Sequence, residues 1–72
     1  MGLEDRIVLN SQILTGKPII KGTRISVEFL LDLLSQGWSY EQIIQNYPPL
    51  TTDDILAGIN FSRRIIRHIR VF

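Results

Sequence analysis

Apolar and polar residues alternate differently in residues 6–25 and in the rest of the chain, and the two patterns predict different secondary structure. Residues 6–25 hold short β-branched runs separated by turn residues, which predicts two or three short strands. Pro18 lacks a backbone N–H group, so we expect it at the start of a strand or at a sheet edge. In the rest of the chain apolar residues recur at helical spacing. This spacing predicts helices over residues 27–36, 40–46 and 52–69.

Each predicted helix begins with a hydroxyl residue that can accept hydrogen bonds from the free N–H groups of the first turn. Ser26, Ser39 and Thr51 occupy these positions. Gln42 and Asp54 follow the last two by three residues, a spacing that allows a reciprocal capping box. The same start pattern therefore marks all three helices.

Glycine and proline mark the ends of the first two helices. Gly37 can adopt a left-handed conformation after the first helix, and Pro48 stops the second. The first helix is apolar almost all round and is expected to be central. The third helix carries a stripe for the core, formed by Ile55, Ile59, Ser62, Ile66 and Ile69. The aromatic residues expected to pack the helical core are Phe29, Trp38, Tyr40 and Tyr47.

These elements predict a mainly α fold, a trihelical homeodomain-like bundle with a short N-terminal β element. The second and third helices then take helix-turn-helix positions. We expect a single domain over residues 1–72, with strands and turns in 6–25 and three helices in 26–70. A chain this short buries only about 60% of its unfolded surface, and it has no cysteine for disulfides. The thin core, the strand composition and the apolar end Val71–Phe72 predict a homodimer.

Charge is distributed unevenly along the chain, although the net charge is only +1. All seven acidic residues lie between positions 4 and 54, whereas the residues from Ile55 onward include four arginines, one histidine and no acid. No apolar run of membrane-spanning length and no basic-then-apolar leader is present, so we expect neither a membrane span nor a signal peptide. The absence of cysteine fits a cytoplasmic protein.

The first candidate binding site is the basic segment that precedes the first helix, with Lys17, Lys21 and Arg24. As a functional surface it would contact phosphates or dock on an acidic partner. The alternative is a solvated strand edge whose lysines discourage aggregation. The glycines of this segment, Gly16 and Gly22, are explained by turn geometry.

The second candidate site is the arginine-rich end of the third helix. It could hold phosphates or the acidic face of a partner, and arginine rather than lysine favours this interpretation, because guanidinium groups suit carboxylates and phosphates. The alternative is a set of cations that match the dipole of a helix C-terminus. The basic residues of this segment are Arg63, Arg64, Arg67, His68 and Arg70.

The start of the third helix argues against a recognition helix that enters DNA. Its first turn carries Asp53 and Asp54, which suit the helix dipole but oppose a phosphate backbone. The preceding turn, residues 46–50, also lacks the glycine of a compact helix-turn-helix. No pair of residues suggests a catalytic nucleophile and its base. His68 is the only histidine and the chain has no cysteine, so we expect no zinc site. We therefore expect no enzyme, no metal and no cofactor.

Three motifs together carry a family resemblance. They are Gly-Lys-Pro-Ile-Ile-Lys-Gly-Thr-Arg-Ile-Ser-Val at residues 16–27, Gly-Trp-Ser-x-Glu-x-Ile at 37–43, and Tyr-Pro-x-Leu-Thr-x-x-Asp-Ile at 47–55. Over roughly residues 7 to 62 the chain resembles the bacterial and archaeal domain-of-unknown-function family four-three-three, whose members are classed as homeodomain-like.

The resemblance implies a VapB-like antitoxin encoded beside a PIN-like nuclease toxin. Such a protein would bind and neutralise the toxin, and it would repress its own operon if it also binds operator DNA. The alternative function is a protein-interaction or dimerisation module without DNA binding.

Overall fold

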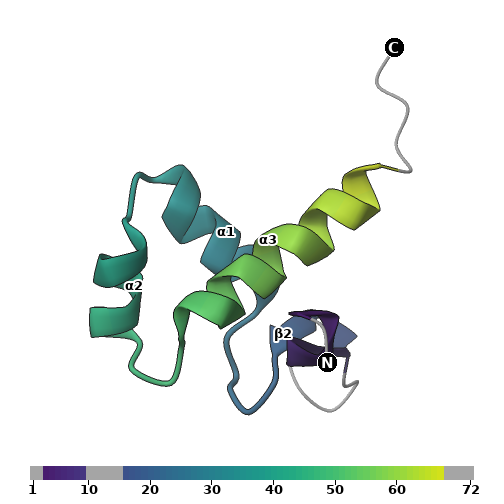
Figure 1. Ribbon diagram of the computed structural model, residues 1–72, viewed down its shortest axis with the longest axis horizontal. Helices are drawn as coiled ribbons and strands as arrows, with labels where there is room; N and C mark the ends of the chain where they lie inside the picture. The colour runs from purple at the N-terminus through teal and green to yellow at the C-terminus, as the bar shows by residue number, and fades with distance from the viewer. Residues whose placement is uncertain (1–2, 10–15, 68–72) are drawn as a thin grey trace.

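The computed structural model describes residues 3–9 and 16–67, which form a short β hairpin followed by three helices (Figure 1). The elements in chain order are the 3₁₀ helix η1 (Leu3–Arg6), β1 (Ile7–Leu9), β2 (Pro18–Ile20), α1 (Val27–Ser35), α2 (Tyr40–Asn46) and α3 (Thr52–Ile66). This arrangement confirms the prediction of a trihelical bundle with a short N-terminal β element.

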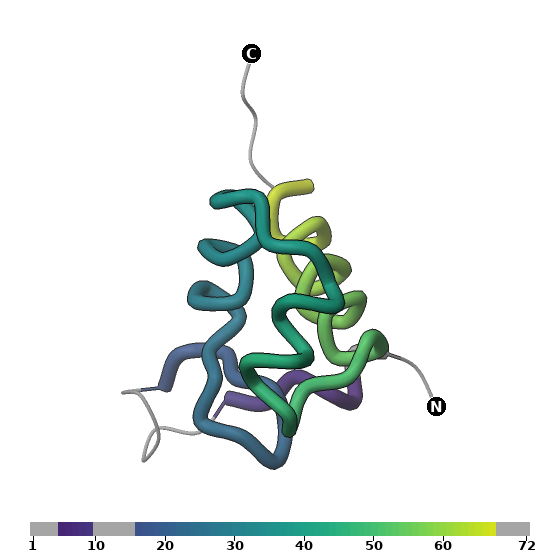
Figure 2. Tube along the Cα trace, turned by 90° about the vertical axis from the view of Figure 1, so that its left-hand side faces the viewer, coloured from purple at the N-terminus to yellow at the C-terminus, as the bar shows by residue number. Residues whose placement is uncertain are grey.

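The two strands form an antiparallel pair in which Ile7 lies opposite Ile20 and Leu9 opposite Pro18. Pro18 is the first residue of β2, as its missing N–H group requires. A single bridge from Ile19 to Ser26 links β2 to the residue that caps α1. The hairpin therefore lies at one end of the helical body, from which α3 runs toward the other end (Figure 2). Residues 10–15 of the predicted strand region lie outside the described residues.

All three predicted caps are present. The Ser26 hydroxyl accepts a hydrogen bond from the Phe29 N–H group at 3.0 Å, and complete capping boxes stand at Ser39 and Thr51. These bonds satisfy N–H groups that have no partner inside a helix. The helix starts therefore follow from contacts three residues apart, which the sequence makes visible.

The first helix ends at the predicted glycine. Gly37 has a φ of 92°, a left-handed conformation that glycine adopts without a side-chain clash. Its N–H group donates to the Leu34 carbonyl, and the N–H group of Trp38 donates to the Leu33 carbonyl. This pair of bonds is a Schellman motif, which turns the chain sharply from α1 toward α2.

The core forms where α1 crosses α3, and it extends to β2, α2 and the α2–α3 connection. Gly58 permits the close crossing: a Cβ atom there would lie 2.8 Å from Cδ2 of the fully buried Leu30. The buried apolar cluster consists of Ile20, Val27, Leu30, Leu33, Ile43, Leu50 and Ile55. None of the helices in the described part of the chain is long and apolar enough to cross a membrane.

The structure corrects three sequence-based expectations. The third helix ends at Ile66 and not at residue 69, and Ile66 is 58% exposed although the helical stripe predicts it in the core. The reason is that the last turns of α3 extend beyond the elements that would cover them (Figure 1). Phe29 and Tyr40 were expected in the core, but they lie partly in solvent, 39% and 36% exposed. Ile69 lies outside the described residues.

Substitution of Gly58 by valine should destabilise the protein by about 2 kcal/mol or more, because the added methyl groups collide with Leu30 at the crossing of α1 and α3. Urea unfolding followed by circular dichroism measures the change. Leu56→Val on the exposed side of the same helix is the control for β-branching and should change stability by about 0.5 kcal/mol. If the two substitutions change the stability equally, α1 and α3 leave room for a side chain at position 58.

Candidate partner-binding surfaces

The loop between β2 and α1 is held rigidly by one threonine. The Thr23 hydroxyl donates to the Ile20 carbonyl at 2.8 Å and accepts from the Ile25 N–H group at 3.0 Å. Gly22, with a φ of 82°, makes the turn possible. Lys21 and Arg24 stand exposed on either side of Thr23. The loop thus presents two cations from a fixed backbone, and we call residues 21–24 the basic loop.

The structure divides the predicted trio Lys17, Lys21 and Arg24. Lys17 donates to the Glu28 carboxylate at 3.1 Å, and both side chains of this pair are largely exposed. Lys21 and Arg24 form no ion pair with any other residue that the structure describes. The anion-binding capacity of this region therefore lies in the basic loop, and Lys17 is already partly neutralised.

An ion pair that the sequence did not reveal joins the N-terminal segment to the start of α3. Arg6 donates to the Asp54 carboxylate at 3.1 Å and lies 3.5 Å from the Asp53 carboxylate. Asp54 is only 6% exposed, and its other oxygen accepts from the Thr51 N–H group at 3.0 Å. One buried carboxylate thus completes a helix cap and anchors the chain that precedes β1.

This ion pair changes the charge that the start of α3 presents. The sequence predicts that the two carboxylates there oppose a phosphate backbone, but Asp54 is buried and Arg6 lies within ion-pair distance of both acids. The Lys21 N–H group donates to the Arg6 carbonyl at 2.7 Å, so the basic loop lies beside this end of α3. A ligand that approached here would meet the two cations of the basic loop and a helix start whose negative charge Arg6 reduces from two to one.

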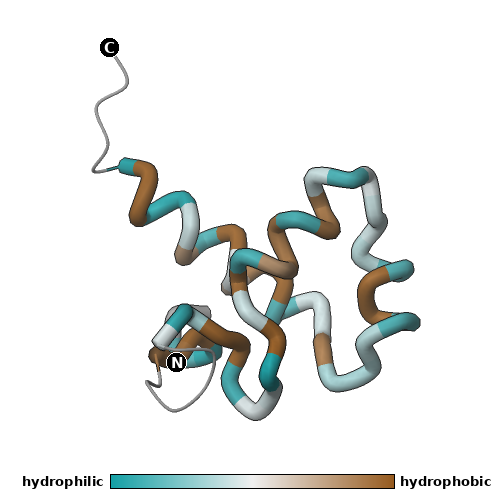
Figure 3. Tube along the Cα trace, turned by 180° about the vertical axis from the view of Figure 1, so that it is seen from behind, coloured by the Kyte–Doolittle hydropathy of each residue, from teal (hydrophilic) through white to brown (hydrophobic). Residues whose placement is uncertain are grey.

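The other end of α3 combines exposed arginines with exposed isoleucines. Arg63, Arg64 and Arg67 are exposed, and Arg63 donates to the Asn60 side-chain oxygen at 3.1 Å. Ile65 and Ile66 are 49% and 58% exposed. Apolar residues continue along α3 to its last turn, beyond the packed body (Figure 3). We call residues 61–67 the projecting end of α3.

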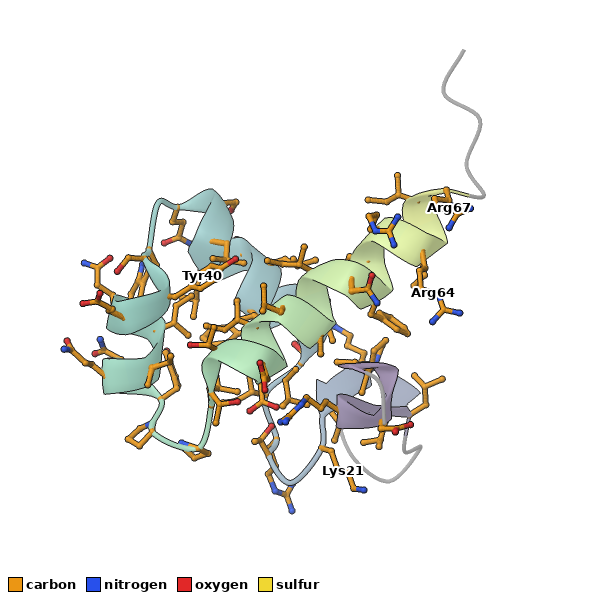
Figure 4. The ribbon with its side chains drawn as sticks, in the orientation of Figure 1. Lys21, Tyr40, Arg64 and Arg67 are labelled. Carbon is orange, nitrogen blue, oxygen red and sulfur yellow. The ribbon has the colours of Figure 1, made fainter. Side chains whose placement is uncertain are left out.

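The two basic surfaces lie at opposite ends of α3. The basic loop stands beside Asp53 and Asp54, whereas Arg64 follows Asp54 by ten residues, or about 15 Å along the helix axis. Figure 4 shows the same separation, with Lys21 below the hairpin and with Arg64 and Arg67 on the projecting end. The predicted cations thus form two surfaces and not one. His68 and Arg70 lie outside the described residues.

A third feature, which the sequence does not predict, is an open depression on the outer side of α1. It has a volume of about 300 Å³ and is lined by Ser26, Glu28, Phe29 and Asp32. The Phe29 ring makes an edge-on contact with Tyr47, with 5.5 Å between the ring centres. The two carboxylates are four residues apart, so they stand on one side of the helix. The depression is therefore acidic with an aromatic wall.

The described residues offer no obvious ligand set for a metal ion, since no three His, Cys, Asp or Glu side chains among residues 3–9 and 16–67 are grouped for one. The three surfaces present guanidinium, ammonium, carboxylate and apolar groups.

Substitution of Arg6 by glutamine should destabilise the protein by about 1–2 kcal/mol, because it leaves the buried Asp54 carboxylate without its cation. Lys17→Gln is the matched control: its ion pair with Glu28 is exposed and should contribute about 0.5 kcal/mol or less. Urea unfolding of the two variants under the same conditions measures both effects. A loss for Lys17→Gln as large as for Arg6→Gln would contradict the anchoring role of Arg6.

The comparisons with known proteins agree with this fold. The crystal structure of a DUF433 member protein from Anabaena variabilis ATCC 29413 superposes with a TM-score of 0.80 and is 29% identical in sequence. The match covers 86% of this chain but 61% of that one, so the chain spans about three fifths of the solved protein. None of the curated proteins matches. The sequence model described as protein of unknown function (DUF433) matches residues 7–62. The chain therefore belongs to the DUF433 family.

Proposed function

We propose that the protein is a non-catalytic binding module whose projecting end of α3 holds an acidic protein partner, in the manner of an antitoxin that neutralises a nuclease toxin. One observation carries this proposal. The apolar stripe of α3 continues past the core as Ile65 and Ile66, and arginines flank it. A helix that has apolar residues on one side and cations on its flanks suits an apolar groove with acidic rims.

The two kinds of side chain would contribute differently to binding. Ile65 and Ile66 are each about half exposed, so their burial against a partner would contribute about 1 kcal/mol or more apiece. Arg63 and Arg67 would add orientation and a faster encounter, because rim charges act mainly on the association rate. Affinity should therefore depend most on the isoleucines and salt sensitivity most on the arginines.

The family resemblance names a partner with suitable chemistry. A PIN-like nuclease toxin that holds Mg²⁺ with carboxylates would present an acidic surface beside its active site. An arginine-bearing helix placed there would compete with the phosphates of the RNA or DNA substrate. Neutralisation of the toxin would then be a direct consequence of docking.

Ile65→Asp should weaken binding to the nuclease encoded by the neighbouring gene by about tenfold or more, because it places a charge in the apolar contact. Leu9→Asp is the matched control: Leu9 is also exposed, at 68%, but it lies on β1. Co-purification and calorimetry with the full chain measure the effect. If the two variants bind equally well, or if the wild-type chain binds no such partner, the proposal is wrong.

The basic loop supports a second candidate function, which is binding of duplex DNA. The supporting observation is the Arg6 ion pair, which weakens the main objection to a phosphate backbone near the start of α3, because it offsets one of the two negative charges there. Lys21 and Arg24 would contact phosphates from the fixed loop, and the exposed Thr52 stands in the first turn of α3. Antitoxins that repress their own operon would use such a surface.

The double variant Lys21→Glu/Arg24→Glu should abolish binding to promoter DNA, and wild-type affinity should fall steeply with salt. Arg63→Glu/Arg67→Glu is the control with the same change in charge at the projecting end, and it should retain at least part of the binding. Fluorescence anisotropy over a salt series measures both. If the wild-type chain does not bind DNA at low salt, this second function is excluded. The protein would then be a protein-interaction module without DNA binding.

A further inference from the structure

We infer that the acidic depression on α1 is a docking site for the projecting end of α3 of a second copy of this chain. This inference goes beyond the proposed function and does not depend on it, because it concerns the protein alone. It rests on two surfaces of opposite charge that the same chain carries. One holds Glu28, Phe29 and Asp32, and the other holds the arginines and isoleucines of residues 61–67.

The depression has the chemistry that recognises a guanidinium group. Glu28 and Asp32 supply two carboxylates, which arginine can contact with a planar fork of N–H donors. Phe29, 39% exposed, offers a ring face or edge against which the same planar cation can stack. An arginine such as Arg67 therefore finds both partners that its shape and charge favour.

The groups that already contact these carboxylates leave room for a guest. Lys17 pairs with Glu28 at 3.1 Å, and the Gln36 amide donates to Asp32 at 2.9 Å. Both contacts lie on the surface, where ion pairs and hydrogen bonds exchange readily with other partners. Each carboxylate also keeps further acceptor sites, since an ionised carboxylate can accept about four hydrogen bonds.

The projecting end of the same chain does not suit this site, so the contact is intermolecular. The α1 residues that contact Gly58 of α3 are Val27 and Leu30, which are buried. Glu28 and Asp32 are each two residues from Leu30 and therefore stand on the opposite side of α1. The depression faces away from its own α3, and only another molecule can present an α3 end to it.

Charge also decides between two ways of pairing copies. Two projecting ends packed against each other through Ile66 would bring the Arg63 side chains of both copies together, because Arg63 is three residues from Ile66 and lies beside it on the helix surface. Like charges at close range oppose such a pair. The α1 surface offers carboxylates instead. There the arginines gain ion-pair partners, and the isoleucines are buried against Phe29.

The geometry implies head-to-tail association. Each chain offers one donor end and one acceptor depression on different elements, and such heterologous contacts extend beyond a dimer unless a ring closes. The interface is small, so we expect weak association, with a dissociation constant of about 10 µM to 1 mM. The predicted homodimer would be its first step. Because the same end of α3 serves the proposed partner, that partner and self-association would compete.

Sedimentation velocity of the full chain tests the first part of this inference. The mean mass should rise with protein concentration past the mass of a dimer and fall back to that of the 8.3 kDa monomer as salt increases. Purely monomeric protein at millimolar concentration and low salt would overturn the inference. A plateau at the dimer mass would overturn the open head-to-tail chain, because only a reciprocal exchange of α3 ends between two copies stops at a dimer.

A charge exchange identifies the two surfaces. Glu28→Arg/Asp32→Arg and Arg63→Glu/Arg67→Glu should each associate at least tenfold more weakly than the wild-type chain. An equimolar mixture of the two variants should associate again, because each depression then meets an end of opposite charge. A mixture that stays monomeric would contradict the assigned surfaces.

The controls for this exchange are Asp5→Arg and Lys21→Glu, which change exposed charges on other parts of the molecule. Both should associate like the wild-type chain, and equal losses in these controls would show that net charge alone drives association. Circular dichroism verifies folding of every variant. If a double variant fails to fold, the single variants Asp32→Asn and Arg67→Gln test the same contact with smaller changes.

Discussion

The ion pair between Arg6 and the buried Asp54 joins the N-terminal segment to the start of α3, and the placement of the basic loop beside this helix depends on it. The Asp54 carboxylate accepts from Arg6 on one oxygen and completes the Thr51 cap with the other. The Arg6 carbonyl in turn accepts from the Lys21 N–H group, which positions the basic loop. A single buried acid therefore fixes a helix start, a hairpin and a pair of surface cations relative to one another.

The close crossing of α1 and α3 at Gly58 accounts for the rest of the arrangement. Because the core gathers around this crossing, the turns of α3 that follow Phe61 extend past the covering elements, and Ile65 and Ile66 remain in water. The same crossing turns Glu28 and Asp32 outward. The apolar arginine-flanked end and the acidic depression are thus two consequences of one packing contact.

Local features of the fold could be predicted from the sequence, and long-range contacts could not. The caps at Ser26, Ser39 and Thr51 and the turn at Gly37 depend on residues within a few positions of one another. Arg6 and Asp54 are 48 positions apart, and nothing in the local pattern connects them. The sequence does not predict the exposure of Ile66, for a related reason. The helical stripe shows which side of α3 is apolar, but not where the elements that cover it end.

The central claim is that α3 separates two binding surfaces and that residues 61–67 at its end contact the proposed protein partner. Hydrogen exchange of the chain, free and in complex with the nuclease proposed as its partner, tests this claim most directly. The account predicts slower amide exchange over residues 61–67 in the complex, with unchanged exchange in the basic loop at residues 21–24. Protection confined to the basic loop or to the first turn of α3 would contradict it.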